Sequence, residues 1–82
     1  MNDITKSWPD NAALRARLRL IDFLLDRYEV FNRAALVDYC GISLVQASLD
    51  IGLYLDCAPG NCSYDKSSKC YRRSATFTRK LP

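Results

Sequence analysis

A glycine-containing turn between two short helical patterns constrains the fold of this chain more than any other feature. Gly41 can adopt the positive φ at which a helix ends, and Ser43 can cap the next helix by accepting hydrogen bonds from its free N–H groups. The apolar residues that follow at helical spacing share one face, and they are Ala47, Ile51, Tyr54 and Leu55. Two short helices joined by such a turn are typical of a helix-turn-helix, in which the second helix lies in the DNA major groove. An ordinary helical hairpin that packs a core is the alternative.

Local signals predict three helices, over residues 8–28, 33–39 and 44–55. Ser7 and Asp10 can cap the first helix, and Asn32 can cap the second. The first helix has an apolar stripe of Leu14, Leu18, Ile21, Leu25 and Tyr28, which Leu20, Leu24 and Phe31 widen. Its opposite face is polar and carries Arg15, Arg19, Asp22, Asp26 and Glu29. The second helix is expected to turn Ala35, Leu36 and Tyr39 inward.

The periodicity changes to that of short strands after the third helix. Residues 58–61, Ala-Pro-Gly-Asn, form a turn signal, and residues 62–64 and 70–72 alternate around a polar loop. This pattern puts Tyr64 and Tyr71 on one face of a hairpin. Further short strands are expected at residues 29–31 and 75–77. The predicted fold is mainly α with a small β-hairpin: a winged helix-turn-helix of three helices plus a wing, forming a single domain over residues 1–82 with a core of about 8–78 and frayed ends.

Charge is distributed unevenly along the chain, although its formal net value is only +3. Acids dominate residues 20–56, whereas residues 66–80 contain no acid and carry Lys66, Lys69, Arg72, Arg73, Arg79 and Lys80. A basic segment on a small domain suggests a phosphate backbone as its partner, with a solvated surface strand as the alternative.

Several classes of function are disfavoured by what the sequence lacks. It has no His, no paired-carboxylate motif and no phosphate-binding Gly loop, and Asp50 and Asp56 are interpreted as helix-surface or capping charges, so no enzymatic activity and no cofactor are expected. No C-x-x-C pair occurs among Cys40, Cys57, Cys62 and Cys70, so we expect four reduced thiols and no metal, with a Cys₄ zinc site as the alternative. No apolar run reaches the ~18 residues of a membrane span, and the first residues show no signal peptide. A cytoplasmic location, in a bacterium or from a phage or mobile element, is the expectation.

The turn, the third helix and the expected hairpin follow the pattern of a known family in order. The matching stretches are Gly41-Ile42-Ser43, Gln46-Ala47-Ser48 with Asp50, Ala58-Pro59-Gly60-Asn61, and Tyr64-Asp65-Lys66-Ser67 with Lys69 and Tyr71. Over roughly residues 18–77 the chain resembles the N-terminal winged helix-turn-helix of the BrxR/CapW-type regulators. Members of this family are WYL-domain transcriptional repressors found beside bacterial phage-defence systems.

The resemblance implies a sequence-specific transcriptional regulator, a repressor that binds an inverted repeat in double-stranded DNA as a homodimer. By matching position, the third helix is implied to contact DNA through Ser43, Gln46 and Ser48, and Leu44 and Leu49 complete the predicted helix site. The wing is implied to contact phosphates through Lys66, Ser67 and Lys69. The Gln46 amide has the chemistry to pair with an adenine edge.

Two departures limit what the resemblance implies. Family members continue into a WYL domain and a further C-terminal domain, so ligand control is not carried over and no small-molecule ligand is expected in this chain. The third helix has no Lys or Arg, and Leu49 stands where related helices are often basic or small. A leucine there can contact a thymine methyl group, or it can indicate a protein partner in place of DNA. The alternative function is therefore a winged-helix protein-interaction module, such as an antagonist of a regulator or a phage or mobile-element accessory protein.

Overall fold

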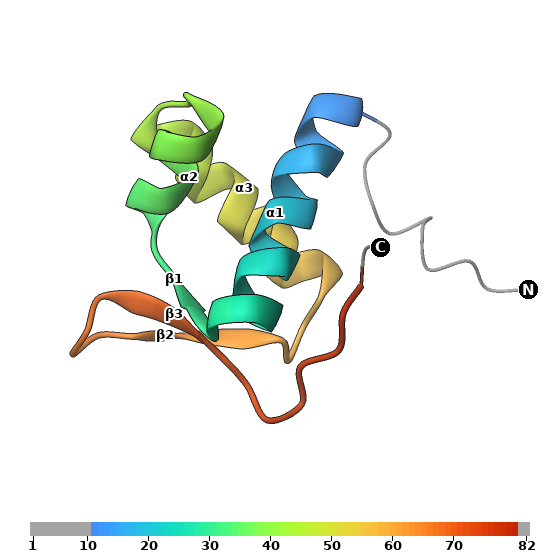
Figure 1. Ribbon diagram of the computed structural model, residues 1–82, viewed down its shortest axis with the longest axis vertical. Coiled ribbons are helices and arrows are strands. Elements are labelled where there is room, and N and C mark those ends of the chain that lie inside the picture. The colour runs from blue at the N-terminus through green and yellow to red at the C-terminus, as the bar shows by residue number, and fades with distance from the viewer. Residues whose placement is uncertain (1–10, 81–82) are drawn as a thin grey trace, which may run out of the picture.

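The computed structural model describes residues 11–80 as three helices above a small three-stranded sheet (Figure 1). The elements in chain order are α1 (Ala12–Tyr28), β1 (Val30–Phe31), α2 (Arg33–Cys40), α3 (Leu44–Cys57), β2 (Cys62–Asp65) and β3 (Cys70–Arg73). This is the predicted winged helix-turn-helix, with the β2–β3 hairpin as the wing. Helices α2 and α3 begin where the sequence predicted and run slightly further than it predicted.

The helix-turn-helix is formed by α2, α3 and the turn at Gly41. The side chains of Asn32 and Ser43 cap the two helices, accepting from the backbone N–H groups of Ala35 and Gln46 at 3.0 Å each. Gly41 ends α2 with a φ of 67°, in the left-handed region that favours glycine. These three roles confirm the predictions made for the turn.

The start of α1 differs from the prediction. Asn11 has an extended backbone (φ −65°, ψ 116°), and its side chain caps the helix by accepting from the N–H of Leu14. The helix therefore begins at Ala12 and not at residue 8. Ser7 and Asp10, which were predicted to cap it, lie outside the described residues.

The hydrophobic core lies where α1, α3 and the sheet meet. Its buried members are Leu18, Ile21, Leu24, Leu25, Phe31, Leu36, Ala47, Ile51, Tyr54, Ala58 and Cys62. Two residues predicted to face this core do not: Tyr28 is 59% exposed and Tyr39 is 74% exposed. Both stand in the last turn of their helix, so the neighbouring elements leave their rings in solvent. Within residues 11–80 no single helix is long and apolar enough to span a membrane; α2 and α3 meet that test only as a pair bent by 114°.

The sheet is antiparallel and has the order β1–β3–β2. Tyr64 lies opposite Tyr71 with the ring centroids 4.9 Å apart, which confirms that the two share a face. Tyr71 also stacks on Phe31 of β1 at 5.2 Å, so the wing is joined to the core through aromatic rings. The strand predicted at residues 75–77 is wrong, because the chain turns there and the N–H of Phe77 donates to the carbonyl of Ser74 at 3.0 Å.

Asp22 is fully buried, although the sequence placed it on the polar face of α1. Its carboxylate accepts a hydrogen bond from the Tyr54 hydroxyl at 2.6 Å, from Arg79 Nε at 3.1 Å and from the backbone N–H of Lys80 at 2.9 Å. The Tyr54 hydroxyl accepts in turn from Asn61 Nδ2 at 3.0 Å. This network joins α1, α3, the turn before β2 and the C-terminal segment, and burial at its centre raises the pKa of Tyr54, which therefore keeps its proton.

The Tyr54→Phe variant removes the hydroxyl at the centre of this network and keeps the ring. A buried carboxylate oxygen and a buried amide each lose a partner, so we expect the free energy of unfolding to fall by about 1–3 kcal/mol, measured by urea denaturation. Tyr64→Phe is the matched control, since that ring is 50% exposed, and it should change stability by less than about 0.5 kcal/mol. A Tyr54→Phe variant as stable as the wild type would show that the network does not stabilise the fold.

Candidate nucleic-acid interface

Aliphatic side chains form the outward face of the first two turns of α3. Leu44 is 55% exposed, Val45 71% and Leu49 63%. Val45 and Leu49 are four residues apart and are therefore neighbours on the helix surface. Leu44 and Leu49 belong to the predicted site, whereas Val45 was missed. The helical spacing from Leu49, on the face opposite the buried Ala47, was the signal that could have found it.

The polar side chains predicted on α3 have partners within the protein. Ser43 caps the helix, and Gln46 Nε2 donates to Asp50 Oδ1 at 2.9 Å. The Ser48 hydroxyl accepts a hydrogen bond from a terminal nitrogen of Arg33, at the start of α2, at 3.0 Å. The structure thus brings a cation from α2 to the edge of the α3 surface, which sequence reasoning did not anticipate.

A buried ion pair holds α3 against α1. Arg17 of α1 donates through Nε to Asp50 Oδ2 and through a second nitrogen to Oδ1 at 3.3 Å. The Asp50 side chain is 1% exposed and that of Arg17 19%. The hydrogen bond to Asp50 raises the pKa of Arg17, so the guanidinium stays charged. The interpretation of Asp50 as a helix-surface charge is wrong, because Arg17 compensates its burial.

The predicted wing residues lie at the exposed tip of the β2–β3 hairpin. Lys66, Ser67 and Lys69 are all exposed. Asp65 holds the turn: its side chain accepts from the N–H of Ser67 at 2.9 Å, and its carbonyl accepts from the N–H of Lys69 at 2.8 Å. Arg72 of β3 pairs with the Asp65 carboxylate at 2.8 Å. The single acid of the tip is therefore compensated, and the two lysines remain as its positive charges.

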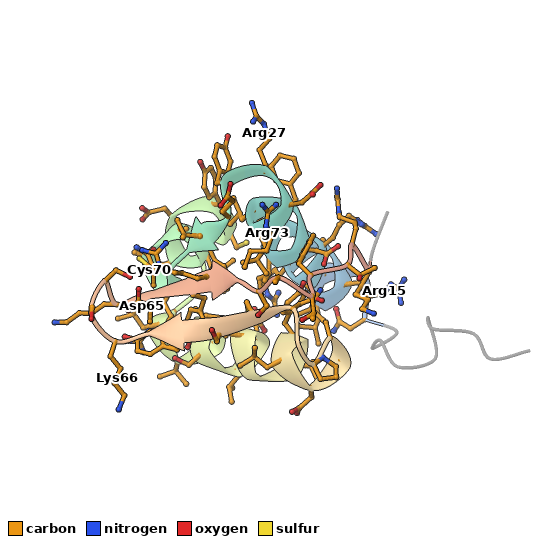
Figure 2. The ribbon with its side chains drawn as sticks, turned by 90° about the horizontal axis from the view of Figure 1, so that it is seen from below. Arg15, Arg27, Asp65, Lys66, Cys70 and Arg73 are labelled. Atoms are coloured by element: carbon orange, nitrogen blue, oxygen red, sulfur yellow. The ribbon has the colours of Figure 1, made fainter. Side chains whose placement is uncertain are left out.

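Lys66 of the wing and Arg27 of α1 point in different directions. Figure 2 shows Lys66 at the tip of the hairpin, pointing toward the side of the view on which α3 lies. Arg27, at the end of α1, points to the opposite side of the same view. Lys66 thus extends from the wing toward the side of the molecule on which α3 lies.

The thiols of Cys40, Cys57 and Cys62 do not have the acidity of a reactive site. Burial raises the pKa of Cys62 to about 11, and it also raises the pKa of Cys40 and of Cys57, so these groups are protonated at neutral pH. No disulfide is formed by the four described cysteines. Across residues 11–80 no three Cys, Asp or Glu side chains come together in a way that could hold a metal ion.

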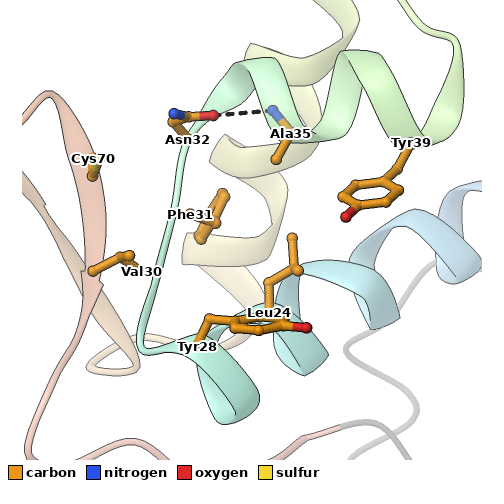
Figure 3. A pocket seen from close by; sticks show the side chains of 8 residues that line it. All are labelled: Leu24, Tyr28, Val30, Phe31, Asn32, Ala35, Tyr39 and Cys70. Atoms are coloured by element: carbon orange, nitrogen blue, oxygen red, sulfur yellow. Dashed lines mark hydrogen bonds between the residues drawn. The ribbon is translucent and has the colours of Figure 1, made fainter.

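A shallow groove of about 450 Å³ lies between α1, α2 and the sheet (Figure 3). It is lined by Leu24, Tyr28, Val30, Phe31, Asn32, Ala35, Tyr39 and Cys70. One polar group in the groove, the amide oxygen of Asn32, already accepts a hydrogen bond from the N–H of Ala35 as the cap of α2. The groove therefore offers mainly hydrophobic contact surface.

The fold and this surface together define a winged helix-turn-helix domain. Residues 13–82 match the family model of the BrxR transcriptional regulator winged helix-turn-helix domain, and the chain belongs to that family. It is 46% identical over 61 residues, 74% of this chain and 20% of the relative, to the DNA-binding transcriptional repressor CapW of Escherichia coli strain KTE188. It is 41% identical over 66 residues, 80% of this chain and 22% of the relative, to the DNA-binding transcriptional repressor CapW of Pseudomonas aeruginosa. The chain thus spans about a fifth of the length of these curated relatives.

The pairing of Arg72 with Asp65 can be tested through the pKa of the Asp65 carboxyl group. The hydrogen bond from Arg72, followed by those from Ser68 and Ser67, lowers the pKa of Asp65 to about 2. Because this pKa is lower in the folded than in the unfolded chain, the carboxylate stabilises the hairpin above pH ~4, and that contribution is lost as the pH falls toward 2.

In Arg72→Ala we expect an NMR titration to give an Asp65 pKa closer to the ordinary value. Arg73→Ala removes the neighbouring cation, which pairs with Glu29, and should leave the Asp65 pKa unchanged. An ordinary Asp65 pKa in the wild type would contradict this account of the wing.

Proposed function

We propose that this chain is a sequence-specific, double-stranded DNA-binding domain of a transcriptional regulator, and that the regulator is a repressor. The observation that carries the proposal is the exposed face of α3 in a domain of the BrxR winged helix-turn-helix family. In a helix-turn-helix the second helix enters the major groove, and α3 is that helix here. Curated relatives named DNA-binding transcriptional repressors support the direction of regulation.

In this proposal the wing supplies phosphate contacts that do not depend on sequence. Lys66 and Lys69 carry the charge, and Ser67 between them has a hydroxyl that can donate to a phosphate oxygen. Arg33 adds a cation at the edge of α3, where it already contacts Ser48. The compensation of Asp65 by Arg72 favours this role, because it removes a charge that would repel the DNA backbone.

The proposed base contacts come from Ser43, Leu44, Gln46, Ser48 and Leu49. Gln46 is the residue whose chemistry fits an adenine, but bidentate pairing needs both its amide oxygen and its nitrogen. In the free protein that nitrogen donates to Asp50. Adenine reading by Gln46 therefore requires its second amide hydrogen, or exchange of that bond on DNA binding, and it stays a prediction.

The regulator is proposed to act as a homodimer on an inverted repeat, with binding rather than catalysis as its activity. Two copies on two half-sites give a helix-turn-helix protein the specificity that one small domain lacks. A protein-interaction module is the second candidate, and the aliphatic, cation-free face of α3 favours it. Retention on duplex DNA that falls steeply as salt rises separates the two candidates, because only phosphate contacts release counterions.

Replacing both Lys66 and Lys69 by Ala tests the wing. We expect weaker binding to all duplexes alike, and a slope of log K against log salt that is flatter by about two units, because two phosphate contacts are lost. Affinity is measured by fluorescence anisotropy at several salt concentrations. The control replaces Arg19 and Arg27, both exposed on α1, by Ala; it removes the same charge and should leave the slope unchanged. A double lysine variant with the slope of the wild type would remove the wing from the proposal.

Sedimentation velocity tests the assembly. We expect a homodimer, free or on DNA, with part of α1 or the C-terminal segment at its interface; the exposed Phe23 and Tyr28 of α1 supply apolar surface for such a contact. The DNA is a duplex enriched by the protein from a randomised pool, and the control is the same length of duplex with one half-site scrambled. Two copies should bind the enriched duplex cooperatively and the control poorly. A monomer in solution that also binds the enriched duplex as a single copy would exclude the dimer.

A further inference from the structure

The part of α3 that stands furthest from the core is apolar. Val45 and Leu49 are adjacent on the helix and are 71% and 63% exposed. Gly52 follows on the same face, and a Cβ added there would meet no atom within 4 Å. Exposure to water does not stabilise leucine and valine side chains, whereas burial against an apolar group does. We call the exposed surface of Val45 and Leu49 the crest of α3, and a crest of this kind on a groove-binding helix favours an apolar partner.

The hydrogen-bonding groups of the same turns have partners within the protein. Gln46 is half-buried and donates to Asp50, whose carboxylate is held by Arg17. The Ser48 hydroxyl is held by Arg33. A helix that reads bases mainly by hydrogen bonds has to exchange such internal bonds or add to them. The exposed Val45 and Leu49 beside these groups carry only methyl groups.

The floor of the major groove offers one apolar group, the C5-methyl of thymine. Every other base edge there presents nitrogen or oxygen atoms, and covering those with Val or Leu costs their hydration without a replacement hydrogen bond. We infer that α3 selects its DNA by packing Val45 and Leu49 against thymine 5-methyl groups. This inference rests on the proposed DNA-binding function and names how that function distinguishes sequences.

The charges around the crest agree with a duplex as the occupant. The crest itself carries no Lys or Arg, whereas Arg33 stands at its edge and Lys66 and Lys69 stand on the wing. Base edges line the floor of the major groove and phosphates line its rims. An apolar centre with Arg33 at its edge, and further cations on the wing, fits this arrangement.

Replacing thymine by deoxyuridine removes the methyl group and keeps every hydrogen-bonding atom of the base. The experiment uses the 82-residue chain and the duplex that it enriches from a randomised pool, prepared once with thymine and once with deoxyuridine. At one fixed salt concentration we expect the uridine duplex to bind about fourfold more weakly for each contacted methyl, the equivalent of ~0.8 kcal/mol per group.

Variants assign the effect to the two side chains. In Val45→Ala and Leu49→Ala the ratio of the affinities for the thymine and uridine duplexes should fall toward one, because the packing partner of the methyl is gone. Both side chains are exposed, so the fold should be kept, which circular dichroism checks. Gln46→Ala is the matched control on the same helix: it should keep the ratio of the wild type, whatever it does to affinity. A ratio caused by altered duplex shape would persist in all three variants.

The outcomes separate the inference from the function on which it rests. Tight, salt-dependent binding with equal affinity for the two duplexes would overturn methyl reading and leave DNA binding in place. An enriched site without thymine in either half would do the same. Failure to enrich or retain any duplex would overturn both and would favour a protein partner for the apolar crest.

Discussion

A buried carboxylate, that of Asp22, holds the pieces of this small domain together. Asp22 belongs to α1, and its carboxylate accepts hydrogen bonds from the hydroxyl of Tyr54 in α3, the guanidinium of Arg79 and the backbone N–H of Lys80. A buried charge is costly unless it is paired and hydrogen-bonded, so these partners are required once Asp22 is inside. The consequence is that the C-terminal segment packs back on α1 and α3, and the position of α3 becomes fixed from its second half.

The Arg17–Asp50 pair fixes the first half of α3 in the same manner. The two anchors lie on the inner side of the helix, so its opposite side is left as a surface with a defined orientation. Gln46 donates a hydrogen bond to Asp50, and Val45 and Leu49 are the exposed side chains on the outer side of the helix. The orientation of the exposed face of α3 therefore depends on the partners of two buried acids, Asp22 and Asp50. A change at either acid should disturb that face from the inner side of the helix.

Local chemistry made most of the fold predictable from sequence, because caps and turns act over a few residues. Asn32 and Ser43 cap α2 and α3 as predicted. The alternating pattern of the two strands correctly predicted that Tyr64 and Tyr71 share one face of the hairpin. Burial of Asp22 and Asp50 was not predictable in this way. Their cationic partners are 57 and 33 residues distant in the chain, so the helical pattern of α1 or α3 alone assigns each acid to the solvated face.

The candidate site was predicted in part, for a related reason. Choosing polar side chains on α3 as base readers ignores whether those groups have partners, and only the structure shows that Gln46 and Ser48 do. The consequence is a division of labour between two elements. In the proposed complex, phosphate contacts by Lys66 and Lys69 give affinity that salt weakens, whereas methyl contacts by α3 carry no charge and are insensitive to screening. Raising the salt concentration should therefore reduce binding to all DNA while leaving the preference between sequences nearly constant, a behaviour that a recognition helix rich in Lys or Arg would not share.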